Sequence, residues 1–185
     1  MQKEFSGRQA VICPEGVFII GSYDANGVPN AMNAAWGQQS DFGEITLFLS
    51  QHKTTENIKI TKAFTVAFAT RKTLVISDYF GVETGAKVNK IEKAGCHVHK
   101  AAHVNAPVIE EYPVTLECQL KSWDDSTGIL VGEIVAMQAD ESVLTDGKVD
   151  FDKLDPLLYD SSTGSYRTFG PVVGKAFHDG LVLKK

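Results

Sequence analysis

The chain has 185 residues, of which 43% are hydrophobic and 22% are charged, and its formal net charge is −5 at pH 7. This size and composition suit a single globular domain with a sizeable core. The acidic balance argues against nucleic acid as the main partner, because a phosphate backbone favours a basic protein surface.

The N-terminal part of the chain is predicted to form a β-hairpin and a further strand. The first strand covers residues 17–23, and Asn26-Gly27 in the following turn is a strong hairpin signal because both residues tolerate positive φ. The return strand, residues 30–36, has the sequence NAMNAAW. Its small side chains suit either the close approach of a flat group to the backbone or tight packing against a helix. A second turn leads into a strand over residues 44–50.

The segment that follows this strand has the composition of an anion-binding site. A helix is expected to begin near Thr54 or Thr55, since threonine is a good N-cap whose hydroxyl accepts a free N–H of the first turn. Free N–H groups and the helix dipole together favour a phosphate group there. Lys53 adds a positive charge and Ser50 a further hydroxyl. The same residues also suit an ordinary capped surface helix, so spacing alone leaves both interpretations open.

The middle of the chain is predicted to alternate between strand and helix. Residues 64–70 are almost wholly apolar, as in a central strand. Residues 73–80 have helical spacing, with Gly81 as the expected stop. Residues 89–94 are expected to form a shorter helix that ends at Gly95.

Two long strands, residues 113–123 and 128–139, follow and are joined by a turn rich in Asp and Ser. The second strand is apolar on both faces for much of its length, which suits packing against an outside helix or a partner subunit. Strict alternation would place Leu130, Ile134 and Ala136 on one face and Ile129, Val131, Glu133, Val135 and Met137 on the other. Antiparallel hairpins with few short helices predict a mostly β chain folded as a barrel, with residues 143–185 as an irregular tail.

Membrane, exported and disulfide-rich proteins are disfavoured by the sequence. No apolar run is long enough to cross a bilayer, and residues 1–16 contain no signal-peptide core. The three cysteines, Cys13, Cys96 and Cys118, are odd in number and widely spaced, which argues against a disulfide framework. We therefore expect a cytoplasmic protein that does not bind membranes, in which Cys118 is a buried apolar side chain.

One cluster, made by Cys96, His97, His99 and His103, has residue types that could bind a metal. Residues two apart share one face of a strand, so His97 and His99 would face one side and Cys96 the other. This spacing does not bring three ligands together without a loop, and no Cys-x-x-Cys or His-Glu-x-x-His motif supports it. We predict structural or surface roles for these side chains and no metal site.

Several short motifs occur along the chain in a specific order. They are Asn33-Ala34-Ala35-Trp36; Ser50, Lys53 and Thr55 before a helix; Asp78-Tyr79-Phe80-Gly81 with Thr84-Gly85; Ala106-Pro107-Val108-Ile109-Glu110; Leu116-Glu117-Cys118; Gly132-Glu133-Ile134-Val135; and Tyr159 with Gly164-Ser165-Tyr166. Together, over about residues 10–170, they resemble the flavin reductase-like family of FMN-binding split barrels, and within it the flavoredoxin-like branch. In one place the chain departs from the family's pattern, because Thr84 stands where the family has Ser.

The resemblance implies one FMN-binding domain over residues 1–185, folded as a split β-barrel of antiparallel strands with a few short helices. It also implies a homodimer with one flavin per subunit, and residues 143–185 are expected at the dimer interface. FMN is the expected cofactor, with FAD a weaker fit. The residues expected to bind it are Asn33, Ala34, Ala35, Trp36, Ser50, His52, Lys53, Thr54, Thr55 and Tyr166.

Two of these assignments have an alternative. His52 could contact phosphate or flavin, or be solvated. Tyr159 and Tyr166 could stack near the flavin, or pack in the core or at an interface. No catalytic side chain is expected, because a flavin supplies the reactive centre itself.

The favoured activity is NAD(P)H-dependent reduction of flavin, or of another acceptor through bound FMN. A Gly-x-Gly-x-x-Gly turn after a strand is absent, so NAD(P)H would be a transient visitor without a domain of its own. One alternative is an FMN-bearing electron-transfer protein that is reduced by a protein donor. Another is a flavin-binding module without turnover. The sequence does not separate these, because no motif marks a nicotinamide pocket.

Overall fold

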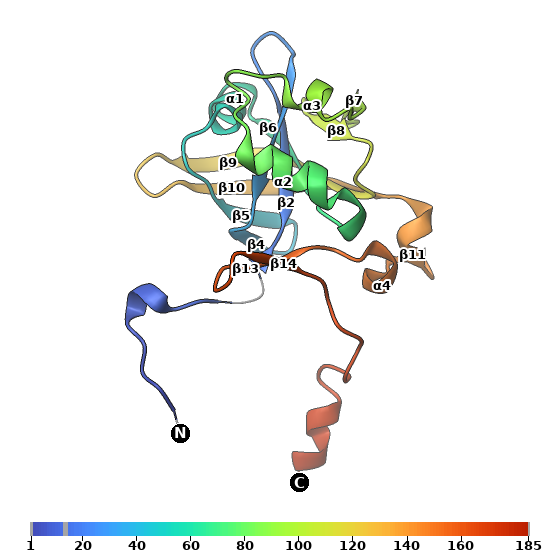
Figure 1. Cartoon of the computed structure of the whole chain (residues 1–185). Coiled ribbons are helices and arrows are strands. Elements are labelled where there is room, and N and C mark those ends of the chain that lie inside the picture. Colours follow the sequence, from blue (N-terminus) through green and yellow to red (C-terminus); the bar gives the residue numbers. More distant parts are fainter. Residues whose placement is uncertain (1, 13–14, 185) are drawn as a thin grey trace.

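The computed structural model describes residues 2–12 and 15–184, so Cys13 lies outside the described residues. Its centre is a curled seven-stranded sheet with the strand order β3-β2-β6-β9-β10-β5-β4 (Figure 1). Every neighbouring pair in this sheet is antiparallel. The strands are β2 (Phe18–Tyr23), β3 (Pro29–Ala34), β4 (Gly37–Asp41), β5 (Glu44–Phe48), β6 (Ala63–Phe68), β9 (Val114–Asp124) and β10 (Ile129–Ala139).

Short helices and small sheets surround this central sheet. The helices are α1 (Lys53–Thr61), α2 (Leu74–Val82), α3 (Lys90–Lys93) and α4 (Phe151–Leu154), with 3-10 turns at Gly7–Gln9, Arg71–Thr73, Glu141–Val143 and Asp179–Leu183. The small sheets are β1 (Glu15–Gly16) with β13 (Leu158–Asp160) and β14 (Ser165–Arg167), β7 (Val98–Lys100) with β8 (Pro107–Ile109), and β11 (Leu144–Thr145) with β12 (Lys148–Val149). The expectation of a mostly β, antiparallel chain with a few short helices is confirmed.

The core lies on both faces of the sheet. On the inner face, fully buried side chains such as Phe64, Leu47 and Leu130 pack together. On the outer face, Ile19 and Phe80 belong to a second cluster that joins β2 to α2 and α3. Cys118 is completely buried among the inner cluster, as expected of an apolar side chain.

The alternation expected along the second long strand is seen in the burial of β10. Leu130 is fully buried and Ile134 packs against the inner cluster, whereas Val135 and Met137 on the other face are about half exposed. The pairing of β10 with β9 contains two irregularities, and the alternating burial of β10 persists through both.

The expected stop of the second helix at Gly81 is wrong, since α2 continues to Val82. A Cβ atom at Gly81 would lie 3.3 Å from Cβ of Asn33, so the glycine allows the helix to pack closely on β3. The shorter helix is as expected, with Asn89 as its N-cap and Gly95 just beyond it in the left-handed region.

The C-terminal region, expected to be irregular, contains α4 and the short strands β11 to β14. Val143, Leu154 and Leu157 are buried, so this region belongs to the folded body as far as β14. Within residues 168–184, Thr168 accepts a hydrogen bond from Arg71 and Phe169 packs on Phe151, and the rest leaves the body on the same side as the N-terminal segment (Figure 1). This exposed C-terminal segment is called the C-terminal arm below.

The close approach of Gly132 to Phe64 yields a prediction about stability. A Cβ atom at Gly132 would meet the tip of the fully buried Phe64 ring and lie 3.0 Å from its Cε1 atom. Gly132→Ala should therefore lower the free energy of unfolding by about 1–3 kcal/mol through overpacking. Urea unfolding measures this loss. Gly170→Ala is the matched control, because a Cβ atom there meets open space, and equal stability of the two variants would contradict the packing assignment.

Candidate functional site

Four adjoining hollows meet along the end of β3 and the turn into β4. Three of them, of about 190, 230 and 350 Å³, all include Asn33 in their lining. The fourth is an open groove of about 1360 Å³ that shares Ala35, Trp36 and Phe48 with the 230 Å³ hollow. The shared residues make these hollows one continuous depression, which we call the β3 groove.

One end of the β3 groove is the start of helix α1. Two buried contacts fix this helix on the sheet: Asn30 Nδ2 donates to Thr54 Oγ1 at 2.7 Å, and Asn57 Nδ2 donates to Ser22 Oγ at 3.1 Å. The N-cap is His52, in extended conformation, and its side chain makes no capping hydrogen bond. The first-turn N–H groups are therefore not satisfied by the cap side chain, and they remain available to a ligand.

The expectation of a threonine N-cap is wrong. Thr55 is fully buried in the first turn, and its hydroxyl accepts the His52 N–H and donates to the His52 carbonyl, both at 2.8 Å. Thr54 is also buried and is the acceptor for Asn30. Thr54 lines the 190 Å³ hollow, whereas Thr55 positions the start of the helix.

Lys53 lines the same hollow, and its ammonium group has an acidic neighbour. Its Nζ lies 3.5 Å from Oδ2 of Asp24, and 30% of the lysine side chain is exposed. Backbone N–H groups of Val28 and Asn26 donate to the Asp24 carboxylate and, with Lys53, hold its pKa below the usual range. The carboxylate therefore stays ionised and pairs with a lysine that an incoming anion would also contact.

Sequence reasoning missed Lys90, a second cation in this hollow. Lys90 is only 4% exposed, and its Nζ donates to the Phe80 carbonyl at 2.8 Å. Burial lowers its pKa to about 8, with Glu83 opposing this shift. A lysine in the first turn of a four-residue helix has no sequence signature, because its burial depends on how α3 packs against α2.

The loop before α3 also lines the hollow, through Thr84 and Gly85. A Cβ atom at Gly85 would collide with Oδ1 of Asn30. The glycine thus permits the loop to lie against the side chain that holds Thr54. The sequence motif that contains Gly85 does not by itself predict this contact with Asn30.

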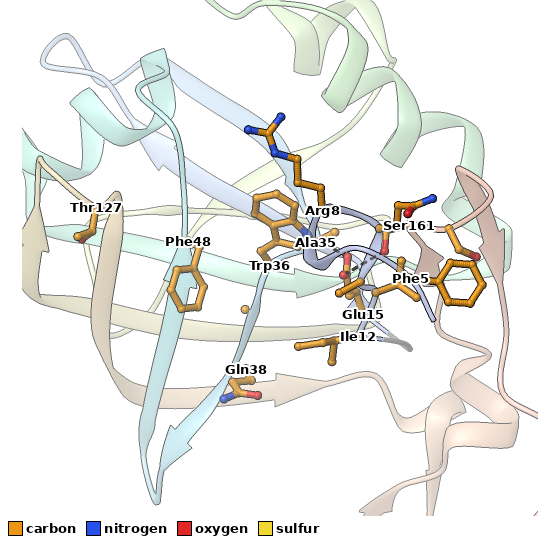
Figure 2. Close-up of a pocket in the computed structure, with 16 residues that line it drawn as sticks. Phe5, Arg8, Ile12, Glu15, Ala35, Trp36, Gln38, Phe48, Thr127 and Ser161 are labelled. Atoms are coloured by element: carbon orange, nitrogen blue, oxygen red, sulfur yellow. Dashed lines mark hydrogen bonds between the residues drawn. The ribbon is translucent and has the colours of Figure 1, made fainter. Parts of the chain in front are cut away.

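The middle of the β3 groove has a more apolar wall. The 230 Å³ hollow is lined by Met32, Asn33, Ala34, Ala35, Trp36, Phe48, Leu49, Ser50, His52 and Tyr159. The strand was expected to extend to residue 36, but β3 ends at Ala34. Trp36 is 62% exposed, and its Nε1 donates to Oε2 of Glu15 at 3.0 Å (Figure 2).

The other end of the β3 groove is the 350 Å³ hollow beside β14, lined among others by Asp78 and Tyr166. The Tyr166 hydroxyl donates to Oδ1 of Asp78 at 2.9 Å. Burial, then the Asp78 carboxylate, raises the pKa of Tyr166 to about 12, so this phenol is neutral at physiological pH. The rings of Tyr159 and Tyr166 lie 6.2 Å apart, and Asn33 Nδ2 donates to the Ser77 carbonyl at 2.9 Å.

The structure thus brings nine of the ten sequence-predicted residues to one depression, with Thr55 buried behind it. Asn33 to Trp36, Ser50 and His52 lie in its middle, Lys53 and Thr54 at the α1 end, and Tyr166 at the β14 end. The arrangement can accept an anion at the two lysines and a flat apolar group beside Trp36. That these residues bind flavin remains a prediction.

His97, His99 and His103 lie outside the β3 groove, and each has a carboxylate partner. Nδ1 of His97, His99 and His103 lies 2.9, 3.2 and 3.3 Å from Glu111, Glu110 and Glu117, respectively. Within residues 2–12 and 15–184, no group of three or more His, Cys, Asp or Glu side chains is arranged to hold a metal ion. No described helix is long and apolar enough to cross a membrane.

The antiparallel sheet with few short helices defines the class of fold as a split barrel, and comparisons with known proteins show its family. The model of the flavin reductase like domain matches residues 10–170. The chain therefore belongs to the flavin reductase-like domain family, and the predicted family and split-barrel fold are confirmed.

Solved structures agree with this assignment. The chain matches flavoredoxin of Desulfovibrio vulgaris (Miyazaki F) with a TM-score of 0.92 and 30% identity, over 97% of this chain and 100% of that one. It matches flavoredoxin from Methanosarcina acetivorans with a TM-score of 0.89 and 30% identity, over 99% and 100%. An FMN-binding domain of a flavin reductases-like enzyme from Shewanella baltica, at 23% identity and a TM-score of 0.78 over 87% and 89%, shares the fold.

A sequence relative gives less information. An uncharacterized protein of Aquifex aeolicus (strain VF5) is 27% identical over 107 residues. This match covers 56% of this chain and 55% of that protein, so the chain spans about half the length of this relative.

Burial of Lys90 yields a prediction about pH. Its folded-state pKa of about 8 lies below the ordinary value of 10.5. Between these values the unfolded chain holds the extra proton, so stability should rise with pH. Relative to Lys90→Met, the free energy of unfolding of the wild type should rise by roughly 3 kcal/mol from pH 8 to 10.5.

The measurement is urea unfolding of both proteins at several pH values across this window. The pH dependence is the readout, because Lys90→Met also loses the bond to the Phe80 carbonyl. Parallel curves for the two proteins would show that Lys90 keeps its ordinary pKa in the folded state.

Proposed function

We propose that the β3 groove binds FMN. The observation that supports this most is the convergence of Lys53, Lys90 and the open first turn of α1 on one hollow of about 190 Å³. A phosphate group suits this hollow, because it can accept several N–H donors and offset two ammonium charges. The isoalloxazine ring would follow the groove towards Asn33 and Trp36.

The residues of the groove fit FMN in chemistry as well as in position. Lys90 is almost fully buried and its pKa is depressed, which is the state of a cation that lacks a full counter-charge. A phosphate dianion beside it would raise this pKa again, because it favours the charged form of the lysine. The small side chains of Ala34 and Ala35 leave the backbone open to a flat ring, and Trp36 and Phe48 offer apolar contact. FMN is also in the names of fold relatives from Shewanella baltica and Thermus thermophilus.

We propose that the chain is an oxidoreductase that uses NAD(P)H to reduce flavin, or another acceptor through bound FMN. Bound FMN would supply the chemistry of accepting a hydride and passing on electrons. The residues of this chain would hold the phosphate through Lys53, Lys90 and Thr54, and would keep water from the ring edge through Trp36 and Phe48. No side chain is assigned as a catalytic acid or base, and Tyr166 is kept neutral by its raised pKa.

A second candidate function is electron transfer from a protein donor without NAD(P)H. The observation in its favour is the match to two flavoredoxins over nearly the whole chain at 30% identity. Under either function we propose a homodimer. Support for a dimer comes from Val135, Met137 and Phe48, which are large apolar side chains that are about half exposed on β10 and β5.

The phosphate assignment predicts how Lys53→Ala changes affinity. Loss of a charge-assisted hydrogen bond should cost roughly 1.5–3 kcal/mol, or about tenfold to a hundredfold in the Kd of FMN. Riboflavin lacks the phosphate, so its Kd should hardly change. Fluorescence titration of both flavins measures the two effects, and Lys72→Ala, an exposed lysine away from the groove, is the matched control.

Two other outcomes would have a different meaning. An equal loss for FMN and riboflavin would mean that the substitution damages the groove as a whole. No loss for either would mean that the phosphate lies elsewhere. Asp24→Asn in the Lys53→Ala background should recover part of the FMN affinity, because it removes the carboxylate that Lys53 otherwise neutralises.

The donor is tested by anaerobic stopped-flow mixing of the FMN-loaded protein with NADH or NADPH. The proposed reductase should lose its visible flavin absorbance with one of the two at a rate that saturates with their concentration. Bleaching only by a reduced low-potential redox protein would contradict NAD(P)H dependence and support the electron-transfer function.

A further inference from the structure

The C-terminal arm, residues 168–184, exposes a run of apolar side chains. Val172, Val173, Phe177 and Leu183 are each at least 85% exposed, and Leu181 and Val182 are exposed as well. The arm runs away from the sheet in Figure 1. Single exposed apolar side chains are ordinary, but a run of this length marks a surface that is covered by another molecule.

The same chain has an open apolar surface of its own. The 1360 Å³ groove is bounded by Trp36 and Phe48 from the sheet edge and by Phe5 and Ile12 from the N-terminal segment (Figure 2). Trp36, Phe5 and Ile12 are 61–85% exposed. The described residues that line the groove include none from the arm, so within residues 2–12 and 15–184 the arm does not cover the groove of its own chain.

We propose that the arm of one copy lies in the Trp36–Phe48 groove of a second copy. Both halves of the contact are present on one chain, so a two-fold axis would form the contact twice and leave neither surface open. A foreign partner for the arm would leave the groove unfilled.

The length of the arm is sufficient for this exchange. Seventeen residues span at most roughly 55 Å when fully extended. A domain of this size has a radius of gyration of about 16 Å. The arm can therefore pass from β14 of one copy on to the body of its neighbour.

The exchange would also place residues of one copy beside the site of the other. Trp36, Phe48 and Ala35 line both the open groove and the adjoining 230 Å³ hollow. An arm seated in the groove would cover the outer side of Trp36 and reduce solvent access to the hollow. This consequence rests on the proposed FMN site, whereas the exchange itself rests only on the two apolar surfaces.

Photo-cross-linking of an isotope mixture tests the exchange without any flavin. A benzophenone amino acid is introduced at position 177, and the unlabelled protein is mixed with ¹⁵N-labelled protein, dissociated and reassociated before irradiation. The expected result is mixed-isotope cross-links between the arm and residues 5–12, 36 or 48. The control has the same photoreactive residue at Val75, which is exposed on α2, and it should give no such link.

Cross-links that join the arm only to the groove of its own chain would overturn the proposal, as would cross-links to other surfaces or their absence. A second experiment uses Phe177→Asp with Val173→Asp and measures mass by analytical ultracentrifugation. Each arm loses two apolar contacts, so the Kd of the dimer should rise at least about a hundredfold. Val75→Asp should leave the Kd unchanged, and an unchanged Kd in the arm variant would also overturn the proposal.

In FMN-loaded protein the arm variant should release FMN at least about tenfold faster than the Val75→Asp control. Unchanged release, with dimerisation lost, would show that the arm joins the two copies but does not cover the site. Failure of the protein to bind FMN at all would leave the cross-linking result intact, so the two proposals fail separately.

Discussion

The break in the sheet between Ala34 and Gly37 is the feature on which the rest of the structure depends. β3 pairs with β2 up to Ala34, and β4 pairs with β5 from Gly37, at the opposite edge of the sheet. The two residues in between cross from one edge to the other, and the Trp36 carbonyl accepts a hydrogen bond from the Phe48 N–H at 2.8 Å. A strand that changes partner in this way opens the barrel and leaves its own backbone accessible to a ligand.

The position of this break determines which charged side chains line the site. It brings the end of β3 beside the start of α1 and the loop before α3, so two lysines from separate helices line one hollow. Lys53 is paired with Asp24. The Lys90 ammonium instead contacts the Phe80 carbonyl and lies 5.9 Å from the centre of the Phe80 ring, with Glu83 as a more distant counter-charge. Such an imbalance costs stability in the free protein, and an anionic ligand would relieve it.

Local sequence patterns predicted much of the fold. The Asn26-Gly27 turn, the two long strands and the apolar run of β6 each depend on near neighbours, and all three are confirmed. The His52 N-cap, the continuation of α2 through Gly81 and the burial of Lys90 were not predicted. Each of these depends on contacts between elements far apart in the chain, as when Gly81 meets Asn33. The sequence therefore predicts the strands more accurately than it predicts the positions of the side chains that complete the site.

The most direct test of the account is the chromophore of the purified protein. The account predicts a yellow protein, or one that takes up one FMN per chain with a micromolar or lower Kd, and release of FMN on unfolding, identified by mass. Binding of FMN should quench flavin fluorescence as the ring contacts Trp36. A colourless protein that leaves the fluorescence of added FMN unchanged at micromolar concentrations would contradict the central claim.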